Sequence, residues 1–411
     1  MKSSYKPLGQ YIQPVVGRNN DLGDLPLVGL SIHKKFIPSI ANTVGTDMST
    51  YRIIEKNQFA YGPVTSRNGD KITIALFTDY EKALISQAYI PFEVKDKKEL
   101  DPEYLMMWFR RPEFDRYARF KSHGSAREIF DWEEMCNTQL PIPHIDKQRE
   151  IVKEYNVIQN RIALNQQLIQ KLEETAQAIY KQWFVEFEFP DVNGNPYKSS
   201  GGEMVWCEEL GKGIPLGWEL KCLKDISEIK TGPFGSALLN EQYISGGTPV
   251  ITVEHIKDFK ISNLDYPSVT KEDSKRLKAY ALLEGDIIFS RVGSVDLSAL
   301  IQPENEGWLF SSRMLRLRPK KDKIHPILLS NFLKLKETRN MIISLSVGST
   351  MPSINTEILA GIPFCYFPNF IGDKISNVFV KFDKLVSIHY LENQKLKELK
   401  ELLLSRLATV E

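Results

Sequence analysis

Two long stretches of the chain carry apolar residues at alternating steps of four and three, the pattern of an amphipathic helix that packs against a second helix. In the first stretch the apolar positions run from Ile151 to Trp183 and are interrupted by the polar Asn165. The same spacing returns 224 residues later, where His389 stands at the position of Asn165. The pattern predicts two long helices, over 146–187 and 372–411.

The length of these helices indicates that they pack against each other. At ~1.5 Å per residue each would be on the order of 50 Å long, which is too long for one small domain to cover its apolar stripe. We expect an antiparallel coiled coil in which Asn165 lies near His389 and fixes the register. Asp146 and Asp373 are the expected N-caps. The alternative is a pair of ordinary long core helices. The residues predicted to pair are Ile151, Tyr155, Ile158, Ile162, Ile169, Leu172, Ile179, Phe379, Phe382, Val386, Leu396 and Leu403.

The repeat extends upstream of the helices at the same offset of 224 residues. Pro102 and Pro326 each precede an apolar helical stretch, and Gly124-Ser125 is matched by Gly348-Ser349. Further upstream the offset changes by a few residues, as insertions in loops would make it do. The chain therefore contains a globular domain followed by a long helix, and it contains this unit twice, which predicts pseudo-two-fold symmetry.

The repeated unit also predicts the domain organisation. We expect globular domains over 1–145 and 214–371, and an exposed linker rich in Gly, Pro, Asn and Ser over 188–213, between the first helix and the second domain. Each domain mixes strand-like alternation, as in KITIALF (71–77), with helical stretches such as the one over 101–120. This mixture favours an α+β fold.

Composition limits the partners and the compartment. The chain has 53 Lys and Arg against 52 Asp and Glu, so its net charge of +1 excludes a polybasic tail protein but allows basic residues to gather on one face. The four cysteines lie far apart and the histidines are scattered, which argues against a zinc site or a disulfide framework. The polar N-terminus, broken by Pro7 and Pro14, and the lack of a long apolar run argue against a signal peptide and a membrane span. We expect a cytoplasmic protein.

The sequence contains no Walker A, Gly-x-Ser-x-Gly or His-Glu-x-x-His pattern. Segment 211–217 loosely resembles a dinucleotide-binding loop, but its third glycine is one position late and Pro215 would break the following helix. The adjacent pairs Glu133-Glu134 and Glu208-Glu209 would not face each other on a helix, so we expect them to be solvated. We therefore expect no catalytic residue, metal site or cofactor in this chain, and a protein that is not itself an enzyme.

Basic and aromatic residues gather at matching places in both halves. Segments 110–127 and 313–339 are rich in Lys and Arg, and each leads into a loop that contains Gly-Ser. Glycine permits close approach of the backbone, and the amides and hydroxyls of such loops bind phosphates or base edges, so we predict a DNA-binding face. Solvated helix faces and plain turns are the alternatives. The candidate DNA-binding residues are Arg67, Arg116, Arg119, Lys121, Gly124, Ser125, Arg127, Gly235, Ser236, Arg291, Arg313, Gly348, Ser349 and Thr350.

Several segments together resemble the DNA-specificity (S) subunit of type I restriction–modification systems, and the resemblance covers essentially the whole chain. The shared layout is a globular domain, a long helix, a linker, a second globular domain and a second long helix. The segments that carry the resemblance are LPIPHIDKQREIVKEY (140–155), QAIYKQWFVEF (177–187), GIPLGWELKCLKDI (213–226), GSALL (235–239), GSTMPSI (348–354) and IPF (362–364).

The resemblance implies that each globular domain is a target-recognition domain that reads one half of a bipartite, asymmetric sequence in double-stranded DNA. The paired helices would set the length of the unread spacer. They would also bind the modification (adenine methyltransferase) and restriction (ATP-dependent translocase–nuclease) subunits. S-adenosylmethionine, ATP and Mg would then be cofactors of those partner subunits, in agreement with the lack of a catalytic motif in this sequence.

Three features depart from a simple version of this expectation. The near-zero net charge implies that partner subunits supply part of the affinity for phosphates. Lys400 and His389 interrupt the apolar seam of the second helix, and Met351 stands where the first loop has Arg127.

The alternative function is a coiled-coil structural adaptor that bridges proteins without DNA specificity, which would show no salt-dependent binding to DNA.

Overall fold

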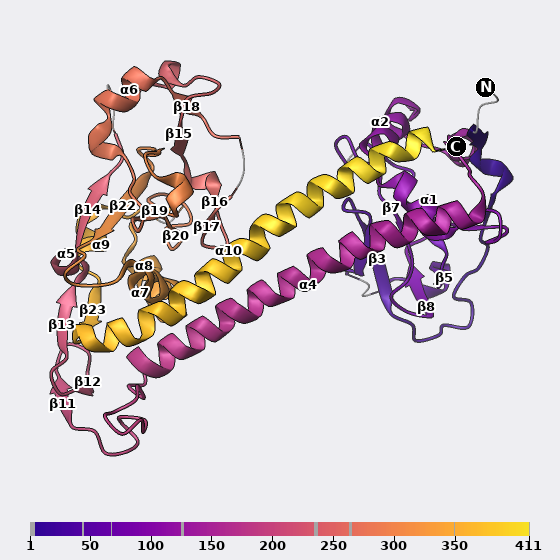
Figure 1. The fold of residues 1–411 in the computed structure, drawn as a ribbon. Coiled ribbons are helices and arrows are strands. Elements are labelled where there is room, and N and C mark those ends of the chain that lie inside the picture. The colour runs from indigo at the N-terminus through magenta and orange to yellow at the C-terminus, as the bar shows by residue number, and fades with distance from the viewer. Residues whose placement is uncertain are drawn as a thin grey trace. The chain divides into compact units, whose positions relative to one another are not determined.

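The computed structural model describes residues 5–42, 45–66, 68–124, 127–233, 237–262, 265–348 and 350–410. The chain folds into two compact units. Unit 1 comprises residues 1–166 and 390–411, and unit 2 comprises residues 167–389. Two long helices, α4 (Ile145–Phe184) and α10 (Asn369–Arg406), contribute to both units, and each unit adds sheets and short helices (Figure 1). The predicted α+β class is confirmed.

Unit 1 contains two four-stranded sheets and a short ladder. One sheet has the order β2-β9-β6-β7 and is antiparallel, and the other has the order β4-β3-β8-β5 with β3 and β8 parallel. Strands β1 and β10 pair near the two ends of the globular part. The strands are β1 (Tyr5–Pro7), β2 (Ile12–Pro14), β3 (Leu27–Ser31), β4 (Lys35–Pro38), β5 (Arg52–Glu55), β6 (Phe59–Tyr61), β7 (Ile74–Leu76), β8 (Lys82–Ile85), β9 (Ile90–Val94) and β10 (Gln139–Pro141).

The short helices of unit 1 cover the core of the first sheet. Helix α1 starts at Pro102 because the Asp101 carboxylate accepts hydrogen bonds from the first free backbone N–H groups, at 2.8 Å from Glu103. Its last residue, Phe109, packs edge-on against Phe59, with the ring centroids 5.8 Å apart. The short helices are α1 (Pro102–Phe109), α2 (Pro112–Phe120) and α3 (Trp132–Asn137).

Unit 2 repeats this arrangement with one four-stranded and one three-stranded sheet. Its main sheet has the order β14-β22-β19-β20, and a smaller sheet, β18-β15-β21, contains the parallel pair β15–β21. The strands are β11 (Met204–Cys207), β12 (Lys212–Pro215), β13 (Glu219–Cys222), β14 (Ser227–Thr231), β15 (Thr248–Ile251), β16 (Ile256–Lys257), β17 (Lys260–Ile261), β18 (Ser268–Val269), β19 (Ile287–Ser290), β20 (Ser298–Leu300), β21 (Leu309–Phe310), β22 (Met314–Pro319) and β23 (Pro363–Tyr366); the helices are α5 (Leu223–Ile226), α6 (Lys271–Arg276), α7 (Pro326–Lys334), α8 (Lys336–Leu345) and α9 (Thr356–Ala360).

The topology confirms the internal repeat. The helices α1 and α7 begin at the matching prolines Pro102 and Pro326. Strand β6 lies inside the main sheet of unit 1 as β19 does in unit 2, and the parallel pair β3–β8 corresponds to β15–β21. In both units a strand that follows the last short helix, β10 or β23, pairs with a strand near the start of the globular part, β1 or β13.

Within each unit the two long helices lie side by side and antiparallel (Figure 1). In unit 1, Tyr155 and Leu404 share one apolar core, and further along α4 the Arg161 guanidinium donates to Glu392 at 2.8 Å. Residue numbers therefore rise along α4 while they fall along α10. In unit 2 the Tyr180 ring packs against Phe379 at 6.1 Å. The residues predicted to pair are all buried or half-buried.

Two details of the helix pair differ from expectation. The polar partner of Asn165 is Asn393, at 3.0 Å between the side-chain amides, one turn after the expected His389. The predicted N-caps are wrong: Asp146 lies inside the first turn of α4, which starts one residue earlier, and Asp373 lies inside α10. The His144 carbonyl already accepts the first helical hydrogen bonds of α4, so the carboxylate of Asp146 interacts with the helix from within the first turn.

The segment predicted as an exposed linker is exposed along most of its length but is anchored by aromatic rings. Phe189 is buried and stacks between Tyr197 and Trp218, with ring centroids 4.6 and 5.3 Å away. Residues 204–215 then form the β11–β12 ladder. The loosely dinucleotide-like segment 211–217 therefore forms a strand and a turn, with no helix behind it to bind a phosphate.

Candidate nucleic-acid interface

Two loops, 123–129 and 347–353, are closed by the same backbone pairing in both units. His123 and Ile129 exchange backbone hydrogen bonds of 3.0 and 2.9 Å, and Val347 and Ser353 do the same at 2.9 Å. The glycines that follow the first residue of each loop have positive φ angles, 132° at Gly124 and 103° at Gly348. A Cβ atom at Gly124 would lie 2.1 Å from a backbone oxygen of the same loop. The tight closure therefore explains why both loops contain glycine at this place.

Each of these loops pairs with a second loop that leaves the main sheet. In unit 1 the backbone N–H of Thr65 donates to the Glu128 carbonyl at 3.0 Å. In unit 2 the N–H of Gly293 donates to the Pro352 carbonyl at 2.8 Å, next to a bridge between Val292 and Ser353. In both units, therefore, the glycine-containing loop is joined to a second loop at the edge of the main sheet.

Two of the predicted arginines meet beside loop 347–353. The backbone N–H of Arg291 donates to the Arg313 carbonyl at 2.9 Å, and the Arg291 carbonyl accepts from Ile354 at 2.9 Å. The Arg313 side chain is exposed, whereas Arg291 is half-buried and its guanidinium donates to the Ser312 carbonyl at 3.4 Å. Gly348 and Thr350 are exposed on the same loop. This cluster is the candidate interface of unit 2.

Unit 1 presents fewer uncompensated cations than its sequence suggests. Arg119 pairs with Glu128, and Lys121 lies 3.4 Å from a carboxylate oxygen of Glu134. Arg127 is exposed on loop 123–129. Arg116 pairs with Glu113 at 3.2 Å, and it lines a different cavity, described below. The predicted residues Arg67, Ser125, Gly235, Ser236 and Ser349 lie outside the described residues.

Several basic residues of segment 313–339 are paired with acids inside the fold. The Arg316 side chain is 2% exposed and bonds Glu228 at 2.6 Å. Arg318 makes two hydrogen bonds of 2.7 Å to the buried carboxylate of Asp286, and these bonds raise the pKa of the guanidinium. Arg339 pairs with Asp296 at 2.9 Å. Charges paired in this way add little attraction for phosphates.

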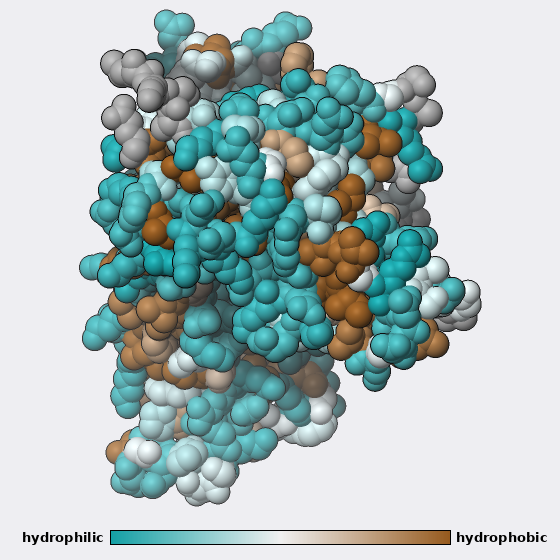
Figure 2. All heavy atoms as spheres, turned by 90° about the vertical axis from the view of Figure 1, so that its right-hand side faces the viewer, coloured by the Kyte–Doolittle hydropathy of each residue, from teal (hydrophilic) through white to brown (hydrophobic). Residues whose placement is uncertain are grey.

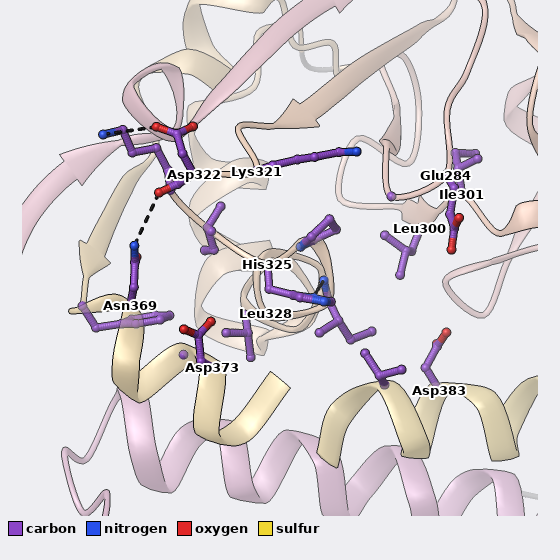
Figure 3. A pocket seen from close by; sticks show the side chains of 18 of the residues that line it. Glu284, Leu300, Ile301, Lys321, Asp322, His325, Leu328, Asn369, Asp373 and Asp383 are labelled. Atoms are coloured by element: carbon purple, nitrogen blue, oxygen red, sulfur yellow. Dashed lines mark hydrogen bonds and ion pairs between the residues drawn. The ribbon is translucent and has the colours of Figure 1, made fainter. Parts of the chain in front are cut away.

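A cavity of about 610 Å³ in unit 2 lies between the start of α7 and the first turns of α10 (Figure 3). Asp373 and Asp383 point into it from α10. Its charged lining consists of four carboxylates and two ammonium groups: Glu284, Asp322, Asp373, Asp383, Lys321 and Lys323. The acidic lining disfavours phosphate, so this cavity is not part of the nucleic-acid interface.

His325 lines this cavity and also caps helix α7. Its Nδ1 atom accepts a hydrogen bond from the backbone N–H of Ile327 at 3.3 Å, which requires the imidazole to be unprotonated at that atom. Burial lowers the pKa of His325, and the nearby Asp373 carboxylate opposes that shift only in part. Protonation would remove the cap and place a charge in a half-buried site.

Replacing His325 by Asn is expected to reduce the acid sensitivity of unit 2. The folded-state pKa lies below the unfolded value of about 6.5, so the unfolded state binds more protons as the pH falls through that value, and wild-type stability decreases there. Asn retains a cap acceptor but does not titrate. Urea unfolding of His325→Asn at several pH values should show a smaller loss below pH ~6.5. If the stability of His325→Asn depended on pH as that of the wild type does, His325 would not be the group responsible for the loss of stability in acid.

The described residues hold no group of His, Cys, Asp and Glu arranged to bind a metal ion. No helix in the described ranges is both long enough and apolar enough to cross a membrane. All four cysteines are unpaired, and burial raises the pKa of the Cys365 thiol to about 12. The face of the molecule drawn in Figure 2 is mostly hydrophilic, with hydrophobic residues gathered in a few compact patches.

The chain belongs to the family described as "Type I restriction modification DNA specificity domain", whose model matches residues 14–174 and 215–401. The two matches cover both halves of the repeat described above. Each match includes one globular part and a portion of a long helix.

The chain is also similar to proteins named as type I restriction enzyme specificity subunits. The type I restriction enzyme MjaIX specificity subunit of Methanocaldococcus jannaschii is 28% identical over 193 residues, which cover 46% of this chain and 42% of that protein. This match therefore spans less than half of the relative's length. The HindI specificity subunit of Haemophilus influenzae is 21% identical over 438 residues, covering 92% of this chain and 91% of that subunit.

A solved structure shows the same fold. The crystal structure of the type I restriction–modification system S subunit from M. genitalium superposes with a TM-score of 0.61, covering 98% of this chain and 95% of that one. The sequences are 14% identical. At this level of identity the likeness supports the fold: two globular parts with long helices.

Proposed function

We propose that this chain is the non-catalytic DNA-reading subunit of a type I restriction–modification complex, and that each unit reads one half of a bipartite target. The observation that carries the proposal is the repeated pair of loops, 123–129 with 64–66 and 347–353 with 291–294, in a chain whose two halves both match the specificity family. Two similar binding surfaces in one chain are what two half-sites require.

The loop chemistry suits base and phosphate contacts. Arg127 and Arg313 are exposed beside their loops, and a guanidinium can bond two acceptors of guanine in the major groove. The backbone at Gly124 and Gly348 is uncovered, so its amides can approach phosphate oxygens. The paired cations Arg119 and Lys121 contribute less, because their charge is already balanced within unit 1.

We assign catalysis and its cofactors to partner subunits. A modification subunit would use S-adenosylmethionine, and a restriction subunit would use ATP and Mg, all in the cytoplasm. The helix pair offers a surface for these partners: in unit 1 the outer faces of α4 and α10 expose Val157, Leu391 and Leu402, each at least half exposed. Exposed apolar side chains on helices are typical of protein–protein contacts. The helix pair would also set the spacer between the half-sites.

The proposal is tested by methylation in the assembled complex. This chain, combined with its modification subunit, should direct adenine methylation to one bipartite sequence in a plasmid library, and the modification subunit alone should not. Binding to that target should fall by roughly 10³ or more as salt rises from about 50 to about 200 mM. Methylation without sequence preference would overturn the proposal. Salt-independent binding would favour the alternative of an adaptor between proteins.

A further inference from the structure

Each unit contains a β-hairpin that has a strained residue at its tip. The hairpin β3–β4 packs on β7 as the hairpin β16–β17 packs on β20. Lys34 at the first tip and Phe259 at the second both have φ = 58°. This left-handed conformation is sterically unfavourable for a non-glycine residue, so glycine would be the ordinary choice at either tip. Such strain persists where the side chain has a role that glycine cannot fill.

In unit 1 the Lys34 side chain is inserted into the corner between α1 and α2. Its ammonium lies 2.8 Å from the Asp115 carboxylate and also donates to the Phe109 carbonyl at the end of α1. The side chain is only 7% exposed. Burial lowers the pKa of Lys34, while Asp115 favours the charged form. The tip of the hairpin is therefore fixed to one corner of the helices by a buried, hydrogen-bonded ion pair.

The same corner is joined to the long helices. The Arg110 guanidinium, next in the chain after Phe109, donates to the Tyr155 hydroxyl of α4 at 3.1 Å. A cavity adjoins the corner in each unit, with a volume of about 460 Å³ in unit 1 and about 310 Å³ in unit 2. In unit 1, Lys400 and Glu401 of α10 line this cavity together with the hairpin. Lys400, which interrupts the apolar seam, therefore faces this cavity at the hairpin.

In unit 2 the tip carries a ring in place of an ammonium. Phe259 lies under two cations of the α7–α8 corner, with its ring centroid 6.0 Å from Lys334 and 5.0 Å from Arg339. The next residue, Lys260, pairs with Glu173 of α4 at 3.3 Å. A cation over an aromatic face is attracted by the ring quadrupole, and more strongly when both are shielded from water.

The two corners correspond residue by residue. At the offset of 224, Arg110 matches Lys334 and Asp115 matches Arg339. The residue that contacts the hairpin tip is thus an acid in unit 1, Asp115, and a base in unit 2, Arg339. The tip residue differs correspondingly, since it is a cation in unit 1 and an aromatic ring in unit 2. In both units a strained hairpin tip is attracted to the corner of the short helices, although the chemistry of the contact differs. The shared feature is therefore the attachment of the hairpin to the corner.

We propose that Lys34 and Phe259 are positioning residues that fix a hairpin of each unit to the corner of its short helices, where that corner meets the helix pair. The role in DNA reading rests on the proposed function: a fixed globular part holds its recognition loops at one orientation to the helices, so the complex accepts one spacing between half-sites. The attachment itself is a property of the chain alone.

The attachment is tested in the full chain by amide hydrogen exchange. Phe259→Leu removes the ring but keeps an apolar tip, and exchange in residues 256–261 should become roughly tenfold faster. Phe259→Tyr should restore the wild-type rate. Asp258→Gly is the matched control, because Asp258 has φ = 49° at the same turn and is exposed; its exchange should be unchanged or slower. Unchanged exchange in Phe259→Leu, or a uniform rise throughout unit 2, would overturn the proposal.

A second variant tests unit 1 without leaving a buried carboxylate unpaired. The double change Lys34→Met and Asp115→Leu removes both charges at once, since a single change would strand the other charge and could prevent folding. Exchange in residues 31–38 should again become roughly tenfold faster, with α4 unaffected. An unchanged rate would overturn the role of Lys34.

The assembled complex separates this inference from the proposed function. If the unaltered complex methylates one bipartite target, Phe259→Leu should also allow methylation of half-sites at a neighbouring spacing, and Phe259→Tyr should not. A target as strictly spaced as that of the wild type would overturn the positioning role. If the unaltered complex shows no sequence preference, the proposed function fails, while the exchange rates still decide whether the hairpin tips attach the globular parts.

Discussion

Exchanging Glu219–Tyr366 for the equivalent segment of another family member is expected to change one half of the methylated sequence and leave the other half as it was. The segment is closed at its ends by the β13–β23 ladder, in which Glu219 stands opposite Tyr366. The flanking Trp218 and Phe367 remain, with their rings 5.6 Å apart in the core beneath. The two junctions therefore lie side by side, and the aromatic core that supports them is unchanged by the exchange.

The matched control is the corresponding exchange in unit 1. There the β1–β10 ladder sets Lys6 opposite Leu140, so residues 6–140 form the equivalent segment. That exchange should change only the other half of the target. Mapping the methylated adenines by sequencing gives the target of each of the two exchange variants. A donor segment that altered both half-sites at once would contradict one half-site per unit.

Replacing Gly232 by Ala is expected to lower the free energy of unfolding of unit 2 by about 3 kcal/mol. A Cβ atom there would lie 2.0 Å from the carbonyl oxygen of Ser311, and that oxygen is backbone, which cannot rotate away. The Gly232 N–H also donates to the Met314 carbonyl at 3.1 Å, so the two segments would have to separate at the start of β22. The candidate interface beside Arg313 would move with them.

Gly213→Ala is the control for this change. Its Cβ would meet the nearest side-chain atom at 3.5 Å, an ordinary van der Waals distance, so stability should be within about 0.5 kcal/mol of wild type. Urea unfolding measures both variants, and amide exchange in β14 and β22 locates the effect. Equal stability of Gly232→Ala and Gly213→Ala would show that the backbone at Ser311 moves away from the added methyl group at little cost.

The repeat and the long helices were predictable because they depend on local spacing. Apolar steps of four and three are visible along any helix that is covered on one face, and Pro102 and Pro326 mark helix starts whatever the surrounding fold. The candidate loops could be found because Gly124 and Gly348 occupy backbone conformations that favour glycine. These features need no knowledge of which distant residues meet.

The fate of each charge was not predictable, because the partners are remote in sequence. Arg318 bonds Asp286 and Arg339 bonds Asp296, 32 and 43 residues away. A basic segment that is to be neutralised inside the fold has the same composition as one that is to bind DNA. The hairpin tips were missed for a related reason: Asp258-Phe259 lacks the Asn-Gly pattern that ordinarily marks a tight turn, since the ring at the tip offsets a poor turn sequence.

The unlike chemistry of the two hairpin corners has a consequence for the gene. Repeated halves are substrates for unequal crossing-over, which would copy one half over part of the other. A recombinant that joined the Lys34 hairpin to the α7–α8 corner would place an ammonium against Lys334 and Arg339, because Arg339 stands where unit 1 has Asp115; the acid beside Arg339, Asp296, is already paired with it. Divergence at these few positions thus penalises scrambled products and helps to keep the two halves distinct during descent.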